Sequence, residues 1–356
     1  MTPAVSILVP IYNVERYLEE CLQSIADQTL RDIEVICIND GSTDGSRDII
    51  QKFMDADARF KVIDKPNSGY GASMNKGLRF ARGEYVGIVE SDDFIELDAM
   101  ERLYEAARTN DADVVKANFW FYWSVPEERD EFWELVKPEW ANRVYAPRDE
   151  GSEAIFYEKP SIWSAIYRRS FLEESGIDFL ETPGASYQDA SFTFKVWACA
   201  QRVYLLHDAV LHYRQDNEAS SVNSPGKVFT VCGEYAEISR YVEERTELAH
   251  LRPVVERMKY DTYMWNYDRL SDDLKLKFLP TMAKEFRDDA ERGWIDYAYF
   301  DDWKAECLQI LMESVDEFHV VQMNRSEESG LQRALNYYRH GGMGSLLKTL
   351  ARRMRG

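Results

Sequence analysis

Three short polar segments near the N-terminus carry side chains suited to binding chemistry. They are residues 10–13, 40–44 and 90–93. The ring of Tyr12 can stack on a base, and the carboxylate of Asp40 can accept a hydrogen bond from a pyrimidine imide. The acids of residues 90–93 are ligands that a hard divalent cation prefers, and such a cation also binds phosphates. Together the three segments predict a binding site for a nucleotide diphosphate.

Each polar segment directly follows an apolar run of strand length. The runs are residues 5–9, 33–38 and 85–89, and helical spacing of apolar residues occurs at 18–25 and 72–81. This alternation predicts an α/β fold with a mostly parallel sheet and helices on both faces. Ligands bind outside the carboxyl ends of such strands, so we expect the three segments to converge at one edge of the sheet.

The rest of the chain changes character twice. A further strand is expected at residues 113–119, and residues 119–140 are interpreted as an inserted loop or lid rich in aromatic and acidic residues. Helical periodicity dominates from residue 227 onward. The predicted parts are two halves of an α/β domain at residues 1–100 and 101–225, a helical region at 226–340 and a basic amphipathic tail at 341–356.

The composition narrows the class of protein. A net charge of -20, from 63 acidic and 43 basic residues, disfavours nucleic-acid binding because phosphate backbones need a basic face. Five cysteines without a C-x-x-C pair argue against a disulfide framework and a thiolate zinc site. No signal stretch precedes the strand at residue 5, and no apolar run reaches the roughly 18 residues that cross a bilayer. We therefore expect a cytoplasmic protein.

The final segment differs from the acidic remainder. Residues 341–356 mix basic and apolar side chains and contain no acid. Two interpretations remain open: a solvated, frayed end, or a short amphipathic helix that contacts anionic lipid. The second interpretation predicts a peripheral location on the inner face of the cell membrane, since each cation near such a surface contributes about 1 kcal/mol.

The combination of motifs resembles family 2 glycosyltransferases. The matching segments are residues 5–13, 38–46, 67–77 and 90–93, in this order. The resemblance covers roughly residues 4–100 strongly and 155–220 moderately. It implies a Rossmann-like GT-A fold, with residues 1–100 as the nucleotide-sugar-binding half and residues 101–225 as the acceptor-binding half. It also implies inversion at the anomeric carbon and a Mn²⁺ or Mg²⁺ ion that bridges the diphosphate.

The resemblance also implies roles for individual residues. Asp92 would ligate the metal, Glu90 stands where the family usually has the first Asp of its D-x-D motif, and His212 would complete the metal shell. The family often has Arg where this chain has Met74. The residues implied for the nucleotide are Pro10, Tyr12, Asn13, Asp40, Ser42, Asn67, Gly69, Asn75, Ser91 and Arg214.

An inverting transfer needs a carboxylate that takes the proton from the acceptor hydroxyl. Asp189 matches the second acid of the family's Glu-Asp pair, and Gln188 replaces the Glu. Trp163 and Tyr167 match a family segment near the acceptor. Aromatic faces suit the C–H surfaces of sugars.

Ordinary structural roles compete with several of these assignments. Asp44 and Asp189 can cap helices, and Asp93 either caps the following helix or lies around the metal. Trp163 can belong to the core between apolar neighbours, and His212 can be a strand residue. The glycines at residues 69 and 71 suit a backbone that passes close to a ligand.

The sequence thus predicts an inverting glycosyltransferase that uses a UDP-sugar. The expected acceptor is a saccharide or a lipid-linked molecule in the synthesis of a cell-surface polysaccharide or glycoconjugate. The alternative is a non-catalytic module that binds a nucleotide sugar, in which Glu90 and Gln188 mark lost chemistry. A dinucleotide-dependent dehydrogenase is excluded because no G-x-G-x-x-G follows the first strand.

Overall fold

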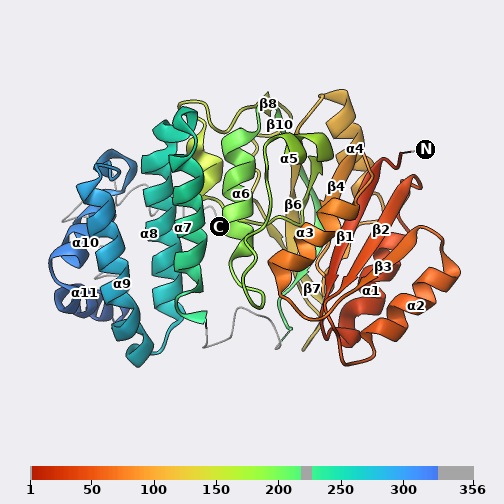
Figure 1. The fold of residues 1–356 in the computed structure, drawn as a ribbon, viewed down its shortest axis with the longest axis horizontal. Coiled ribbons are helices and arrows are strands. Elements are labelled where there is room, and N and C mark those ends of the chain that lie inside the picture. Colours follow the sequence, from red (N-terminus) through yellow and green to blue (C-terminus); the bar gives the residue numbers. More distant parts are fainter. Residues whose placement is uncertain (1, 218–226, 328–356) are drawn as a thin grey trace. The chain divides into compact units, whose positions relative to one another are not determined.

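The computed structural model describes residues 2–217 and 227–327. These residues form two compact units, each considered by itself. The first unit contains residues 2–217 and 232–241, and the second contains residues 227–231 and 242–327. Figure 1 shows the helices and strands of both units with their labels. The predicted tail at residues 341–356 lies outside the described residues.

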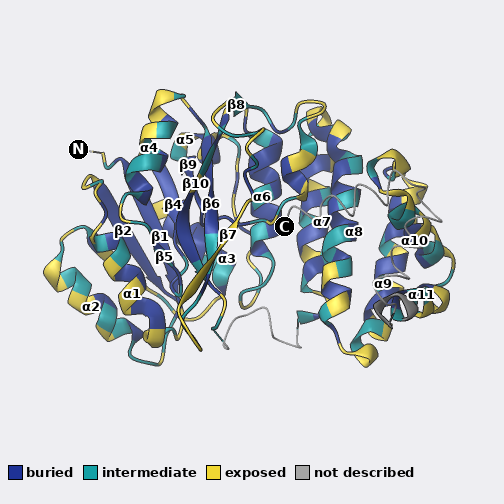
Figure 2. Ribbon diagram, turned by 180° about the vertical axis from the view of Figure 1, so that it is seen from behind, coloured by how far each residue is buried: buried dark blue, intermediate teal, exposed yellow. Residues whose placement is uncertain are grey.

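The N-terminal half of the first unit alternates strands and helices, as the sequence predicts. Its elements are β1 (Val5–Ile11), α1 (Glu15–Ala26), β2 (Ile33–Asn39), α2 (Ser46–Ala56), β3 (Phe60–Asp64), α3 (Tyr70–Phe80) and β4 (Tyr85–Ile88). The strands lie side by side in the order β3, β2, β1, β4, and all three pairings are parallel. Every residue of β1 and β2 is buried, as expected for strands flanked by helices, and Figure 2 draws these strands in dark blue.

The same sheet continues through strands that come later in the chain. The following elements are β5 (Phe94–Ile95), α4 (Ala99–Thr109), β6 (Val114–Trp123), β7 (Arg129–Trp133), β8 (Val144–Tyr145), η1 (Glu153–Tyr157), β9 (Ala165–Arg168), α5 (Arg169–Glu174), α6 (Gln188–Cys199) and β10 (Val203–Arg214). β9 lies antiparallel between β4 and β6, while β10 is parallel to β6. The complete sheet is therefore mixed: the pairings of its N-terminal half are parallel as expected, while its later strands combine the parallel β6–β10 pairing with antiparallel ones.

The expected loop at residues 119–140 is wrong for its first part. β6 extends to Trp123, and β7 pairs with it in antiparallel register from Phe119 opposite Trp133 to Trp123 opposite Arg129. Consecutive aromatic residues favour an extended strand, which explains the longer β6. All five residues of β7 are exposed, and within the described residues this strand pairs with β6 alone.

The C-terminal region is helical, as predicted. Its elements are α7 (Thr230–Glu243), η4 (Thr246–Leu251), α8 (Arg252–Arg269), α9 (Asp272–Glu291), η5 (Tyr297–Tyr299), α10 (Asp302–Glu313) and α11 (Val315–Glu327). The interior of the second unit contains aromatic side chains such as Tyr260, Tyr263 and Phe286. Within residues 2–217 and 227–327, no helix is long and apolar enough to cross a bilayer.

Candidate active site

The loops after β1 and β2 are tied together at the carboxyl edge of the sheet. Asn13 adopts a left-handed backbone conformation with a φ of 51°. Its backbone N–H donates to Ser42 Oγ over 3.1 Å, and its side-chain oxygen accepts from the backbone N–H of Thr43 over 2.8 Å. Asp44 accepts from the backbone N–H of Glu15 over 3.0 Å and so caps the first turn of α1. The two loops therefore form one unit.

Asp40 lies where the sequence places it, at the end of β2, and is buried. Its carboxylate accepts hydrogen bonds from Lys65 Nζ, from Ser68 N over 2.8 Å and from Gly69 N over 3.0 Å. These bonds order the loop between β3 and α3. A nucleotide base that bonds to the Asp40 carboxylate would therefore share it with donors of the protein. The ring of Tyr12 is 53% exposed, which leaves a face for stacking.

The other residues predicted to bind the nucleotide differ in burial: some are exposed on loops and others lie in the core. Pro10 is buried within β1, and Ser91 is buried between the acids of residues 90–93. Asn67 is exposed on the loop that Asp40 orders. Asn75 is buried and exchanges two hydrogen bonds with the backbone of Phe179, over 2.9 and 2.8 Å. In this structure Asn75 therefore holds the chain segment that leads to α6.

The close backbone approach expected at Gly69 and Gly71 is present, but the neighbour is the protein itself. A Cβ atom at Gly71 would lie 2.1 Å from the carbonyl oxygen of Leu180, and one at Gly69 would lie 2.5 Å from that of Thr182. Gly69 also has a φ of 93°, a conformation that L side chains rarely adopt. The start of α3 is thus packed directly on the segment that precedes Asp189.

Replacing Gly71 with Ala is expected to lower the free energy of unfolding by about 1–3 kcal/mol, because backbone atoms must move to admit the methyl group. Gly233→Ala in α7 is the matched control, since nothing lies within 4 Å of its added Cβ. We expect the control to raise stability by about 0.5–1 kcal/mol. Chemical denaturation measures both values. Equal stability of Gly71→Ala and the wild-type protein would show that this contact is not tight.

Glu90 and Asp92 occupy the loop after β4. Glu90 accepts a hydrogen bond from the hydroxyl of Tyr70 over 2.6 Å. Burial raises the pKa of Glu90 to about 8, and the negative charges of Asp92 and Asp189 add to this effect while the Tyr70 bond opposes it. Asp92 Oδ2 accepts from Asn217 Nδ2 over 2.8 Å. The loop therefore concentrates negative charge that a cation would stabilise.

Asp93 is buried, whereas Glu90 and Asp92 are partly exposed. It is 1% exposed, and its Oδ1 accepts from the backbone N–H of Arg214 over 2.9 Å. Burial, reinforced by the charge of Asp92, raises the pKa of Asp93 well above its usual range. These contacts indicate that Asp93 anchors the acidic loop to β10.

Arg214 lies beneath the same loop. Its side chain is 3% exposed, donates to the carbonyl oxygen of Asp92 over 2.9 Å and forms an ion pair with Glu20. The guanidinium also lies over the rings of Tyr17 and Tyr122, at 4.7 and 4.8 Å. A phosphate would reach this group only after a rearrangement, so the geometry favours a role in positioning Asp92.

His212 does not join Glu90 and Asp92. Its Nδ1 lies 2.8 Å from a carboxylate oxygen of Asp130, its Nε2 lies 2.8 Å from one of Glu96, and its ring stacks on Phe94. Both ring nitrogens are thereby engaged. Across the part of the chain that the structure describes, no group of three or more His, Cys, Asp and Glu residues is arranged to hold a metal ion. The predicted three-residue metal shell is therefore not assembled.

Asp189 lies in the first turn of α6. The residue before this helix, Tyr187, has a left-handed backbone conformation with a φ of 63°. Burial raises the pKa of Asp189 to about 6, while the charge of Lys159 and hydrogen bonds from the backbone N–H groups of Asp189 and Ala190 oppose this rise. Both N–H groups belong to the first turn of α6, whose N-cap residue is Tyr187. The charge of Asp189 also raises the pKa of Glu90, so the two carboxyl groups face the same region.

The neighbouring Gln188 has a structural explanation. Its Nε2 donates to Thr182 Oγ1 over 2.8 Å, and its Oε1 accepts from the backbone N–H of Ser186 over 2.5 Å. An ionised Glu could accept the second bond but could not donate the first. Gln188 thus stabilises the loop that precedes Asp189 and positions this residue.

The two aromatic residues predicted near the acceptor are largely buried. Trp163 is 8% exposed and packs against Phe119 and Tyr213, with ring centroids 4.5 and 4.8 Å away. Tyr167 is 3% exposed, and its hydroxyl donates to the carbonyl oxygen of Ile162 over 2.9 Å. Both side chains shape the site from within the core.

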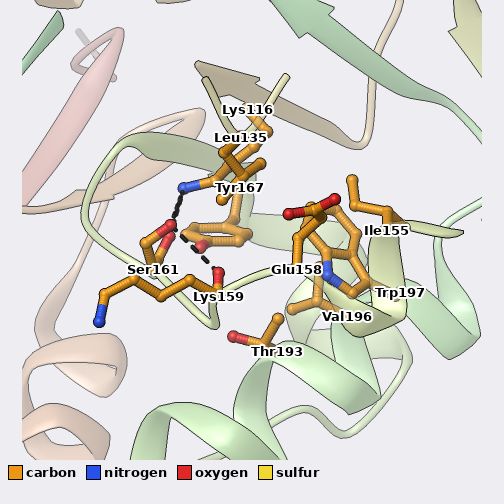
Figure 3. A pocket seen from close by; sticks show the side chains of 10 residues that line it. All are labelled: Lys116, Leu135, Ile155, Glu158, Lys159, Ser161, Tyr167, Thr193, Val196 and Trp197. Atoms are coloured by element: carbon orange, nitrogen blue, oxygen red, sulfur yellow. Dashed lines mark hydrogen bonds between the residues drawn. The ribbon is translucent and has the colours of Figure 1, made fainter. Parts of the chain in front are cut away.

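Sequence reasoning did not identify Lys116, which holds the acceptor-side loop. This buried residue of β6 reaches Ser161 (Figure 3) and donates to Ser161 Oγ over 2.8 Å and to Ser161 O. It also donates to Ser164 Oγ. Burial lowers its pKa well below the usual range. The small pocket in Figure 3 reaches α6 at Thr193, one helical turn beyond Asp189. The only sequence signal was a lysine within an apolar strand.

Fold and site together define an α/β protein of the GT-A type with acidic side chains at the strand ends. Residues 6–176, which carry the strand ends and the acidic loop, match the family model described as Glycosyl transferase family 2, so this part of the chain is similar to that family. It is 35% identical over 221 residues to the uncharacterized glycosyltransferase EpsJ of Bacillus subtilis (strain 168), covering 61% of this chain and 62% of EpsJ. It is 36% identical over 217 residues to the putative glycosyltransferase EpsH of the same organism, covering 60% and 61%. The matches thus span about three-fifths of these relatives.

A solved structure resembles the whole chain. The crystal structure of S. aureus TarS 1-349 in complex with UDP-GlcNAc aligns with a TM-score of 0.70. The alignment covers 91% of each chain at 21% sequence identity. At this identity the likeness shows the fold, and it confirms the predicted GT-A architecture with a helical C-terminal region.

Proposed function

We propose that this protein is a metal-dependent, inverting glycosyltransferase that moves a sugar from a UDP-sugar to an acceptor hydroxyl. The observation that carries the proposal is that Asp189 and the acidic loop lie close together. Tyr70 donates its hydroxyl to Glu90 and its backbone N–H to Gly184, on the segment that leads to Asp189. The charges of Asp92 and Asp189 both raise the pKa of Glu90. The match to the family model supports sugar transfer, and the UDP-GlcNAc in the TarS complex supports a UDP-sugar as donor.

The residues present fit a divalent ion. Mg²⁺ and similar hard cations are commonly bound by one or two carboxylates together with substrate phosphates and water, so a dedicated protein cage is not required. Asp92 and Glu90 supply such carboxylates, and the raised pKa of Glu90 reflects a burial cost that a cation would offset. A bound Mn²⁺ or Mg²⁺ would neutralise charge on the leaving diphosphate.

The remaining steps belong to the chain's own side chains. Tyr12 and Asp40 bind the base at the ends of β1 and β2, and Arg214 holds the acidic loop in place. Asp189 accepts the proton of the acceptor hydroxyl while that oxygen bonds to the anomeric carbon. The bond from this carbon to the diphosphate breaks, and the nucleoside diphosphate leaves with the electron pair. Attack from the opposite face inverts the anomeric configuration.

We further propose that the acceptor is a saccharide or lipid-linked molecule in cell-surface polysaccharide or glycoconjugate synthesis. Such an enzyme would act in the cytoplasm, at the inner face of the membrane. The basic segment at residues 341–356 supplies the charge for a peripheral contact with anionic lipid.

A panel of UDP-, GDP- and dTDP-sugars tests this function without knowledge of the acceptor. We expect Mn²⁺ to stimulate release of UDP from at least one UDP-sugar, and EDTA to abolish the release. Absence of metal-stimulated release from every donor, with intact binding of UDP, would overturn the enzymatic proposal in favour of a non-catalytic binding module.

A further inference from the structure

A series of contacting aromatic rings leads from the buried Trp163, through Tyr213 of β10, to one face of the β6–β7 hairpin. We call this series the aromatic strip; its members are Trp163, Tyr213, Phe121, Trp133 and Trp123. Ring centroids are 4.8 Å apart between Trp163 and Tyr213 and 5.9 Å apart between Tyr213 and Phe121. Phe121 in turn lies 5.0 Å from Trp133 and 6.2 Å from Trp123. Phe121 therefore connects Tyr213 with both Trp133 and Trp123.

The inner end of the aromatic strip adjoins the candidate active site. Lys159 Nζ lies 5.5 Å from the centre of the Tyr213 ring, and the charge of this lysine acts on Asp189. Burial raises the pKa of Tyr213, and the charges of Asp93, Asp92 and Asp189 add to the rise. A molecule placed on this ring would thus lie beside the acidic loop and the proposed base.

The outer end is open to solvent. Trp133 is 39% exposed on the edge strand β7, all of whose residues are exposed. Arg129 lies 3.9 Å above the ring of Trp123, and Glu131 lies opposite Phe121 in the strand register, on the same face. The outer surface therefore combines aromatic rings with a donor and an acceptor of hydrogen bonds.

This combination fits a saccharide better than another protein copy or a lipid surface. Sugars present C–H faces that stack on rings and hydroxyls that bond to charged side chains. Pairing of two β7 edges would bring Asp130 and Glu131 of both copies together, which is unfavourable. The same acids, with Glu127 and Glu128 in the turn, would be repelled by anionic lipid headgroups.

We propose that the aromatic strip binds the acceptor chain beyond the sugar that receives the transferred residue, so that the acceptor is an oligosaccharide or polysaccharide. The inference rests on the proposed function and adds the acceptor class to it. The ring centroids of Tyr213, Phe121 and Trp123 follow one another at 5.9 and 6.2 Å, so these three rings together extend over more than one sugar ring. Several sugar units would therefore contact the strip at once.

An array of defined glycans, each series running from one to six sugar units, tests the inference. We expect the wild-type protein to bind at least one series more tightly as the chain lengthens. Trp133→Ala is expected to weaken binding of the longest member roughly tenfold and to remove the length dependence. Phe132→Ala is the matched control, since Phe132 is the adjacent residue of β7, is 37% exposed and faces the opposite side. The control should bind as the wild-type protein does.

Two results would overturn the inference. One is a wild-type protein that binds no series more tightly than its monosaccharide, and the other is an unchanged length dependence in Trp133→Ala. Release of UDP from the donor in the absence of acceptor is measured in parallel on all three proteins. Normal release with no length dependence refutes the strip alone, whereas no release from the wild-type protein refutes the proposed function independently of the array.

Discussion

Replacing Asp189 with Asn is expected to lower the rate of sugar transfer by at least about 100-fold, while the affinity for UDP in the presence of Mn²⁺ stays unchanged. Asparagine cannot take up the acceptor proton at neutral pH. Its side-chain oxygen can still accept hydrogen bonds from the backbone N–H groups of residues 189 and 190, so the first turn of α6 is expected to stay in place. Transfer kinetics and calorimetry with UDP measure the two quantities.

The pH profile provides a second measurement on the same residue. Burial raises the pKa of Asp189 to about 6, so the wild-type rate should fall as the pH drops through about 6 and the base becomes protonated. The residual rate of Asp189→Asn should lack this step. Asp178→Asn is the control, because the Asp178 side chain is 66% exposed and pairs with Lys195. Full activity of Asp189→Asn would remove Asp189 from the mechanism.

Replacing Asp92 with Ala is expected to weaken binding of UDP in the presence of Mn²⁺ by at least about tenfold, because a ligand of the metal is lost. With EDTA the variant and the wild-type protein should bind UDP equally. Asp92→Asn is a second variant, since an amide oxygen can still accept the hydrogen bond from Asn217 while the charge is removed.

Asp98→Asn is the matched control for Asp92. Asp98 precedes α4, its side chain is 50% exposed and it pairs with Arg102. This variant should bind UDP and Mn²⁺ as the wild-type protein does. Unchanged calorimetric affinity in both Asp92 variants would exclude Asp92 as a metal ligand.

The N-terminal half of the fold follows from local sequence patterns. Each apolar run that becomes β1, β2 or β4 is followed at once by a polar turn, so the positions of Asp40 and Glu90 at the strand ends could be predicted. The second half depends on pairings between distant segments. β9 inserts antiparallel between β4 and β6, and no local signal specifies that partner.

The hairpin shows why a local pattern can mislead. Residues 119–123 are all aromatic and lack the alternation of polar and apolar residues that identifies a half-buried strand. Their strand is stabilised by rings on both faces, among them Phe132 beside Trp120 and Trp133 beside Phe121. The partner strand contributes these rings only once the chain has folded.

The sequence predicted the positions of those site residues that lie in loops directly after a strand. For His212 and Arg214, contacts with residues far away in the chain led to a different role from the predicted one. His212 is held by Glu96 and Asp130, which are 116 and 82 residues away in the chain. Arg214 contacts Glu20, which is 194 residues away. The sequence showed neither pair, because such partners are specified by strand order and not by spacing.

A crystal structure with UDP and Mn²⁺ tests the central claim most directly. The account predicts an anomalous manganese peak within about 2.6 Å of an Asp92 carboxylate oxygen, bridged to the diphosphate, with the base beside Tyr12 and Asp40. A map without manganese at Asp92, or with UDP bound away from the ends of β1 and β2, would contradict it.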